Sequence, residues 1–192
     1  MNDFEYLFAL FGLLLGFTLV EVLKGLVETL KWASPDHNPT ATGIRLGWLT
    51  PLLGLFVLLD ATSWWINLWG VRHFLRVGFD SAFAILLLTS IYYFAASMVF
   101  PRNPDEWPDL DAWFWKRRRQ VLIAIAFANL VGSIFAAIHL TVDRPILGGA
   151  VISLVLLIGA AVPRNPWIVG GSLALWSAIY LLMGILSAVA RT

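Results

Sequence analysis

The residue with the clearest chemical potential in this chain is Asp60, which lies inside a long apolar stretch. Counting back from Trp69 at 1.5 Å per residue places Asp60 about 14 Å from the outer interface of a bilayer, near the midplane. An ionised carboxylate at that depth costs about 2.5–3.5 kcal/mol on insertion scales, so it normally faces a partner or a water-filled cavity. Ser63 and Asn67 follow at i+3 and i+7, on the same helical face. This stripe predicts either a pathway for a cation or proton, or a hydrogen-bonded contact between helices.

Other apolar stretches also carry polar side chains. Tyr92 and Tyr93 are placed mid-span in the third stretch, and Asn129 lies in the fourth. A buried tyrosine hydroxyl normally finds a hydrogen-bond partner. These residues are therefore expected either to contribute to a polar interior or to bond to neighbouring backbone.

A second group of charges closes the first apolar stretch, where Glu21, Lys24, Glu28 and Lys31 share one helical face. Their signs alternate at i+3 and i+4 spacing, which favours ion pairs within the helix. Two interpretations follow from this pattern. The helix either leaves the membrane with its charges self-compensated, or it lines a vestibule on the cytoplasmic side, with Glu21 as its deepest member.

The third group is the basic run Lys116, Arg117, Arg118 and Arg119. It follows an acidic turn and the aromatic segment Ala-Trp-Phe-Trp, a pattern typical of an interfacial stretch whose basic residues lie at phosphate level. We expect these four side chains to contact lipid headgroups, including those of anionic lipids. The alternative is ordinary charge that sets the orientation of the spans.

Motifs for enzymatic chemistry are not found in the sequence. Cysteine is absent, which excludes disulfides, thiolate metal sites and cysteine nucleophiles. The three histidines are far apart, and neither a phosphate-binding glycine loop nor a nucleophile elbow is present. We therefore predict that the protein is not an enzyme, has no catalytic, cofactor or metal site, and does not bind nucleic acid.

The elements that must position these residues are apolar helices. The chain is 59% hydrophobic and 13% charged, with a mean hydropathy of +0.80, whereas soluble domains carry roughly a quarter charged residues. The N-terminal residues contain no basic region, so a cleaved signal is not expected. Since a spanning helix needs about 20 apolar residues, we predict an all-α membrane protein that forms a single domain over residues 1–192. The expected spans are 6–30, 46–69, 80–100, 119–140, 146–162 and 167–189.

Three Asn-Pro pairs divide the chain at nearly equal spacing, with the asparagines at positions 38, 103 and 165. Asparagine is a good N-cap, and proline is favoured at the first helical position. Each pair is therefore predicted to cap a helix that returns through the membrane. The pattern predicts three helical hairpins, 1–70, 71–140 and 141–192, in a threefold repeat of about 64 residues.

Lysine and arginine are distributed unequally between the two predicted faces. Nine basic residues lie at the Asn-Pro face and four at the opposite face. The positive-inside rule then places the Asn-Pro loops in the cytoplasm and both termini outside. A bacterial inner membrane is the expected location.

Two functions fit this sequence. The first is a channel or transporter for a cation or small polar solute, with Asp60 as the midplane charge and Glu21 and Glu28 at the entrance. A six-span bundle of 192 residues has little room for a private pore, so this function implies a homo-oligomer. The alternative is a non-catalytic accessory or scaffold subunit of a larger membrane complex.

Overall fold

The computed structural model describes residues 3–33, 45–103, 106–107, 109–139 and 144–189. Six α-helices account for nearly all of these residues, and within these ranges the one strand-like feature is an isolated bridge between Arg45 and Asp109. The helices are α1 (Asp3–Ala33), α2 (Leu49–Gly70), α3 (Phe79–Ser97), α4 (Leu110–His139), α5 (Arg144–Ala161) and α6 (Pro166–Val189). The predicted all-α class is confirmed.

Helix α2 lies at the centre of the bundle and packs against α1, α3, α4 and α6. Its side chains are accordingly the most enclosed, and Leu53, Phe56, Val57 and Ala61 are all buried. Helix α5 is peripheral, with its main contacts to α4 and α6. The centre of α2 is therefore the position from which one side chain can reach most of the other helices.

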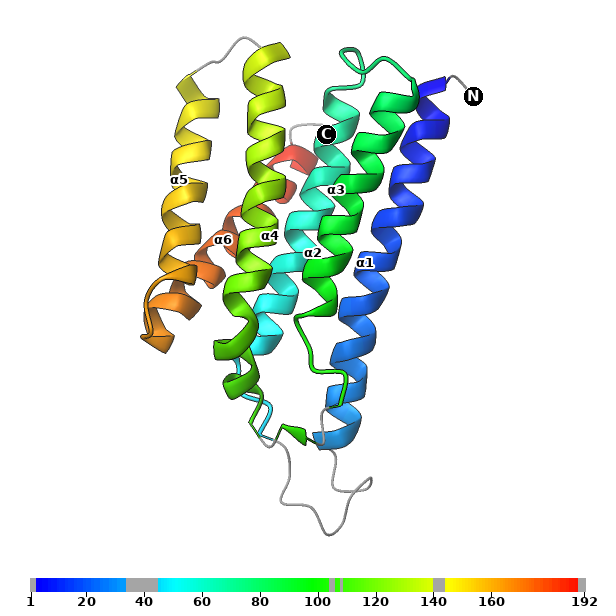
Figure 1. The fold of residues 1–192 in the computed structure, drawn as a ribbon. Coiled ribbons are helices and arrows are strands. Elements are labelled where there is room, and N and C mark those ends of the chain that lie inside the picture. The colour runs from blue at the N-terminus through cyan, green and yellow to red at the C-terminus, as the bar shows by residue number, and fades with distance from the viewer. Residues whose placement is uncertain (1–2, 34–44, 104–105, 108, 140–143, 190–192) are drawn as a thin grey trace.

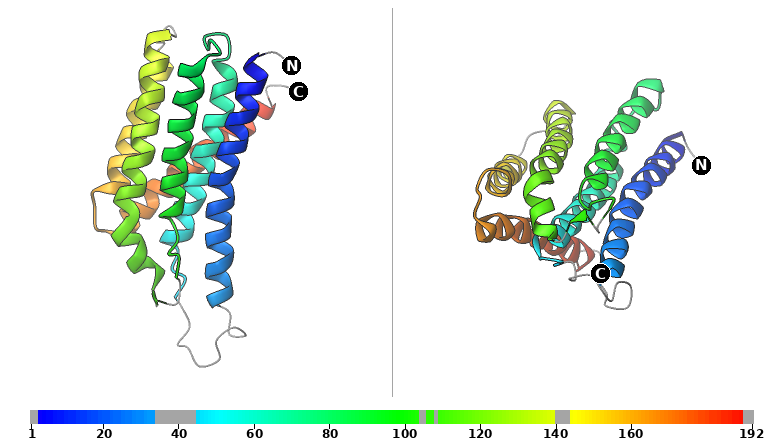
Figure 2. Two further views of the ribbon diagram at one scale, coloured as in Figure 1. Left: turned by 45° about the vertical axis from the view of Figure 1, so that its right-hand side comes forward. Right: turned by 60° about the horizontal axis from the view of Figure 1, so that its bottom comes forward.

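Successive helices run in opposite directions, so α1 begins and α6 ends toward the same end of the bundle (Figure 1). The last residues of α1, α3 and α5 lie at the other end. Helix α6 crosses the remaining helices obliquely, as the two turned views make clear (Figure 2). The near-vertical helices α1 to α4 form the main body of the molecule.

Five helices in the described part of the chain are long and apolar enough to cross a membrane. They are α1, α2, α3, the Leu110–Phe135 part of α4, and the Pro166–Leu186 part of α6, while Ile152–Ala161 within α5 is a shorter apolar helix. Large hydrophobic side chains are exposed over the outer surface of these helices. These features are consistent with an integral membrane protein.

One predicted helix boundary differs from the structure. The fourth span was expected to begin at residue 119, but α4 begins at Leu110, so the basic run lies on the helix itself. The Asp109 Oδ1 atom accepts a hydrogen bond from the Asp111 amide at 2.9 Å and caps the helix there.

The three-hairpin repeat stays a prediction. The pairs α1–α2, α3–α4 and α5–α6 are in contact, but α6 lies obliquely to the helices of the other two pairs.

The three Asn-Pro pairs were each predicted to cap a helix, and the structure differs between them. The Asn165 Oδ1 atom accepts the Trp167 amide at 2.9 Å, and α6 begins at Pro166, which confirms the predicted cap. Asn103 does not cap α4; its amide donates instead to Glu106 Oε1 at 2.7 Å in a short turn before the helix. The cap predicted there is wrong. The pair Asn38-Pro39 lies outside the described residues.

Candidate functional site

The Asp60 carboxyl is completely buried, with 0% of the residue exposed. Side chains from three other helices bind it. The hydroxyl of Tyr92, on α3, donates to Oδ2, and the hydroxyl of Tyr180, on α6, donates to Oδ1. The amide of Asn129, on α4, lies 3.2 Å from Oδ1 and 3.3 Å from Oδ2. We call Asp60, Tyr92, Asn129 and Tyr180 the Asp60 cluster.

The partners of Asp60 are all neutral hydrogen-bond donors. Among the described residues, no lysine or arginine forms an ion pair with this carboxyl. An ionised carboxylate accepts hydrogen bonds only, whereas a protonated one also donates, and a tyrosine hydroxyl can do either. The cluster can therefore hold a carboxylate with three donors, or a carboxylic acid once one hydroxyl turns to accept.

Aromatic packing holds the two tyrosines in place. The Tyr92 ring meets the Trp64 ring edge-on, with centroids 6.4 Å apart, and Tyr180 stacks with Trp176, one turn earlier on α6, at 6.4 Å. The Trp176 ring also contacts the buried ring of Phe56, at 5.0 Å between centroids. These contacts exclude solvent from the carboxyl and restrict the hydroxyl positions.

Small residues allow the helices to approach the cluster. Ala61, next to Asp60, and Ala128, next to Asn129, are both fully buried. At Gly132, one turn after Asn129, an added Cβ would lie 2.6 Å from Cζ2 of Trp64. Helix α4 can reach α2 closely there because residue 132 has no side chain. Asn129 is then near enough to bridge both oxygens of Asp60.

Two members of the predicted polar stripe on α2, Asp60 and Ser63, lie at the cluster, where the Ser63 side chain also interacts with the Tyr180 hydroxyl. Ser63 is partly buried, and its hydroxyl donates to the backbone carbonyl of Asp60 at 2.8 Å. Asn67 is exposed on the outside of the bundle. Asp60 is thus enclosed by other helices while Asn67 is not, and a pathway along this stripe stays a prediction.

The charged face of α1 lies away from the Asp60 cluster. Lys24 Nζ and Glu28 Oε1 are 3.9 Å apart, in the predicted i, i+4 ion pair. The Lys24 side chain is 65% exposed and that of Glu28 is 43% exposed, and Glu21 is partly exposed. This geometry matches the self-compensated helix end, while a vestibule at these residues stays a prediction.

The basic run on α4 divides into side chains with different surroundings. Arg118 is 2% exposed and donates from Nη1 to the Ala160 carbonyl at 3.1 Å and from Nη2 to the Pro163 carbonyl. Arg117 turns toward Trp113 and Gln120. Lys116 and Arg119 are exposed, and contact of these residues with lipid headgroups stays a prediction.

Tyr180 is the member of the cluster that sequence reasoning missed. Asp60 was singled out, and Tyr92 and Asn129 were recognised as polar residues within spans, but nothing in the sequence joined them. The available signal was the position of Tyr180 within its helix. It is the one tyrosine of α6 and lies near the middle of that helix, at a depth in the membrane similar to that expected for Asp60.

No family model matches the chain, and no curated protein or solved structure matches it either. The function must therefore be inferred from the molecule itself.

Proposed function

We propose that the protein is a small membrane transport protein that binds and releases a proton at Asp60. The observation that carries this proposal is the fully buried carboxyl bound by neutral donors from three other helices. Ionisable groups inside membrane spans commonly serve ion or proton pathways. The orientation with both termini outside, the three-hairpin repeat and a bacterial inner membrane belong to this proposal.

The donor set favours a proton over a metal cation. A metal ion is bound by oxygen lone pairs, typically six or more for Ca²⁺ and Mg²⁺. Here the Tyr92 hydroxyl, the Tyr180 hydroxyl and the Asn129 amide all direct hydrogens at the carboxylate. A proton changes this arrangement least, because one rotated hydroxyl suffices to accept from the carboxylic acid.

A proton can move through this site only if the protein changes conformation and lets water reach the Asp60 carboxyl. Asp60 is sealed in this conformation, and α6 contributes both Tyr180 and the aromatic cover of Trp176. Helix α6 is also the oblique helix of the bundle (Figure 1). We propose that a shift of α6 relative to α2 exposes the carboxyl, and that an oligomer provides the remaining wall of the pathway.

The test is proton flux into liposomes that contain the purified protein, driven by a potassium diffusion potential and followed with an internal pH dye. Asp60→Asn should reduce flux to the level of protein-free liposomes. Thr62→Ala is the matched control, since it removes an exposed hydroxyl of the same helix that lies outside the polar stripe and should preserve flux. Equal flux in wild type and Asp60→Asn would remove Asp60 from the pathway.

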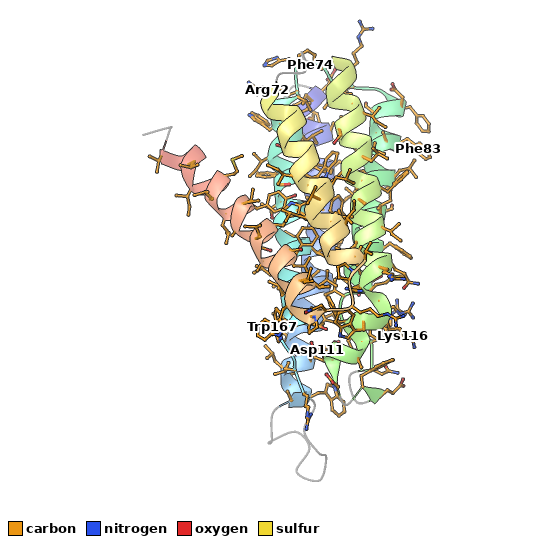
Figure 3. All side chains as sticks on the ribbon, turned by 90° about the vertical axis from the view of Figure 1, so that its left-hand side faces the viewer. Arg72, Phe74, Phe83, Asp111, Lys116 and Trp167 are labelled. Atoms are coloured by element: carbon orange, nitrogen blue, oxygen red, sulfur yellow. The ribbon has the colours of Figure 1, made fainter. Side chains whose placement is uncertain are left out.

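The alternative, an accessory subunit of a membrane complex, is favoured by a different observation. The C-terminal part of α6 exposes apolar side chains on successive positions, including Leu181, Leu182 and Met183, and it leaves the main body of the bundle (Figure 3). A photo-crosslinking residue at position 183 should then join the protein to one discrete membrane protein in native membranes. Cross-links to lipid alone would contradict this role.

A further inference from the structure

A second feature, remote from Asp60 in the fold, is an open cavity between the start of α4 and the α5–α6 connection. It encloses about 470 Å³ and is lined by Trp115, Lys116, Arg118, Arg119 and Arg164. Four of these five residues are cationic, and none is acidic. The labelled Lys116 marks its level on α4, at the end of the molecule opposite Arg72 and Phe74 (Figure 3).

Arg118 gives this cavity a rigid wall. Its two terminal nitrogens bind the carbonyls of Ala160 and Pro163 at the end of α5, and its guanidinium stacks 4.2 Å from the centre of the Trp115 ring. The Nε atom is buried and has no hydrogen-bond partner among the described residues. A buried N–H without an acceptor is costly.

The positive charges around the cavity are not neutralised by the described part of the protein. Arg119 and Arg164 both act repulsively on Arg118, and none of the four cations forms an ion pair with a residue that the structure describes. Arg164 also makes no hydrogen bond with the described residues. Like charges gathered at one site destabilise the fold unless an anion compensates them. Within the described part of the chain, no acidic side chain lines the cavity.

We propose that this cavity binds a phosphate group. Guanidinium groups hold phosphate oxygens through paired N–H donors, and lysine adds a point charge. Basic pockets between membrane helices are suited to lipid headgroups, and the same chemistry serves a free phosphate. The proposal goes beyond proton binding at Asp60, and it adds Trp115 and Arg164 to the basic run while it excludes Arg117, whose side chain lines a different cavity.

The experiment measures binding to the full-length protein purified in a neutral detergent, by native mass spectrometry, in three separate titrations. The probes are phosphatidylglycerol, phosphatidylcholine and inorganic phosphate. A lipid site predicts that phosphatidylglycerol binds more tightly than phosphatidylcholine, with affinity that falls as salt is raised. A site for free phosphate predicts that inorganic phosphate binds without a preference between the two lipids. Either result supports the phosphate site provided that the variant below weakens the binding.

Arg164→Gln is the decisive variant, because it removes one charge from the cavity and no described hydrogen bond. It should weaken binding of the preferred probe about fivefold, the effect expected for one basic residue near a lipid surface. Arg102→Gln is the matched control, since Arg102 is exposed and lines the other cavity. This control and Asp60→Asn should bind as the wild type does.

Three outcomes would overturn the proposal. The first is that none of the probes that carry net negative charge binds. The second is unchanged binding in Arg164→Gln. The third is an equal loss in Arg164→Gln and Arg102→Gln, because that would indicate a diffuse charge on this face rather than a site.

Discussion

The buried carboxyl of Asp60 is costly, and the protein offsets the cost with hydrogen bonds rather than with an opposite charge. Tyr92, Asn129 and Tyr180 supply four contacts to its two oxygens. A lysine or arginine partner would form a neutral pair that no longer needs a proton. Neutral donors leave the charge of the carboxyl adjustable, and this is the property that a proton-binding site requires.

At the level of single residues, Tyr92→Phe should lower the stability of the protein. The change removes one donor from a carboxyl that no water reaches, and such hydrogen bonds inside membrane proteins contribute about 0.6–1.7 kcal/mol. We expect a loss of about 1 kcal/mol, measured as a lower midpoint of thermal unfolding in detergent.

The neighbouring tyrosine provides the control for this prediction. Tyr93 is 46% exposed on the bundle surface, so Tyr93→Phe should change the midpoint little. A double-mutant cycle with Asp60→Asn isolates the Tyr92–Asp60 interaction. Additive losses in that cycle would show that the hydrogen bond to Asp60 is not the cause.

At the level of elements, side chains close helix ends both from within the same segment and from a neighbouring helix. Asn165 caps the start of α6, while Arg118 and Arg119 on α4 bind the last carbonyls of α5, with Arg119 Nε 3.3 Å from the Ala161 oxygen. Unpaired carbonyls at a helix end require such partners. The basic run therefore fixes α5 against α4 in addition to any role at the membrane surface.

Close approach of α1 to the end of α3 depends on Gly25. A Cβ added there would lie 2.7 Å from Cβ and 2.9 Å from Cγ of Phe100, whose ring also fills the space beside Gly54 on α2. Gly25→Ala should therefore force a shift of α1 and cost about 1–3 kcal/mol, the usual range for overpacking. Chemical or thermal unfolding in detergent measures this loss.

Gly16, on the same helix, is the matched control. An added Cβ there meets nothing within 4 Å, and alanine is the better helix former by about 1 kcal/mol. Gly16→Ala should be neutral or stabilising. Comparable losses for both substitutions would contradict the packing of Phe100 between α1 and α2.

At the level of the whole molecule, the sequence was sufficient for the helices but not for their arrangement. Each apolar helix is marked by the hydropathy of its own residues, so the six helices could be predicted from the sequence. The pair Asn165-Pro166 also marked the start of α6 correctly. The start of α4 was misplaced because the charges of Lys116 to Arg119 resemble a loop, whereas Arg118 is buried by α5. That burial is a tertiary contact with no local signal.

The same distinction applies to the candidate site. Asp60 was identifiable because a carboxyl in an apolar stretch is unusual in any context. Its partners were not identifiable, because Tyr92 is 32 residues and Tyr180 is 120 residues away in the sequence. They reach Asp60 only through the packing of α3 and α6 on α2. Asn67, two turns further along α2, was placed on the same face by helical periodicity and is exposed in this structure, so its role in a pathway with Asp60 stays a prediction.

The orientation of the whole bundle is the last prediction. Arg72 and Phe74 lie at one end and Lys116 at the other (Figure 3), and the greater positive charge at the Lys116 end should keep that end in the cytoplasm. The chain contains no cysteine, so single cysteines at Phe74 and Arg102 report on each end separately. A membrane-impermeant thiol reagent should label Phe74→Cys in intact cells, and Arg102→Cys only after the membrane is opened. The reverse pattern would contradict the predicted orientation and place the phosphate-binding cavity on the outer surface.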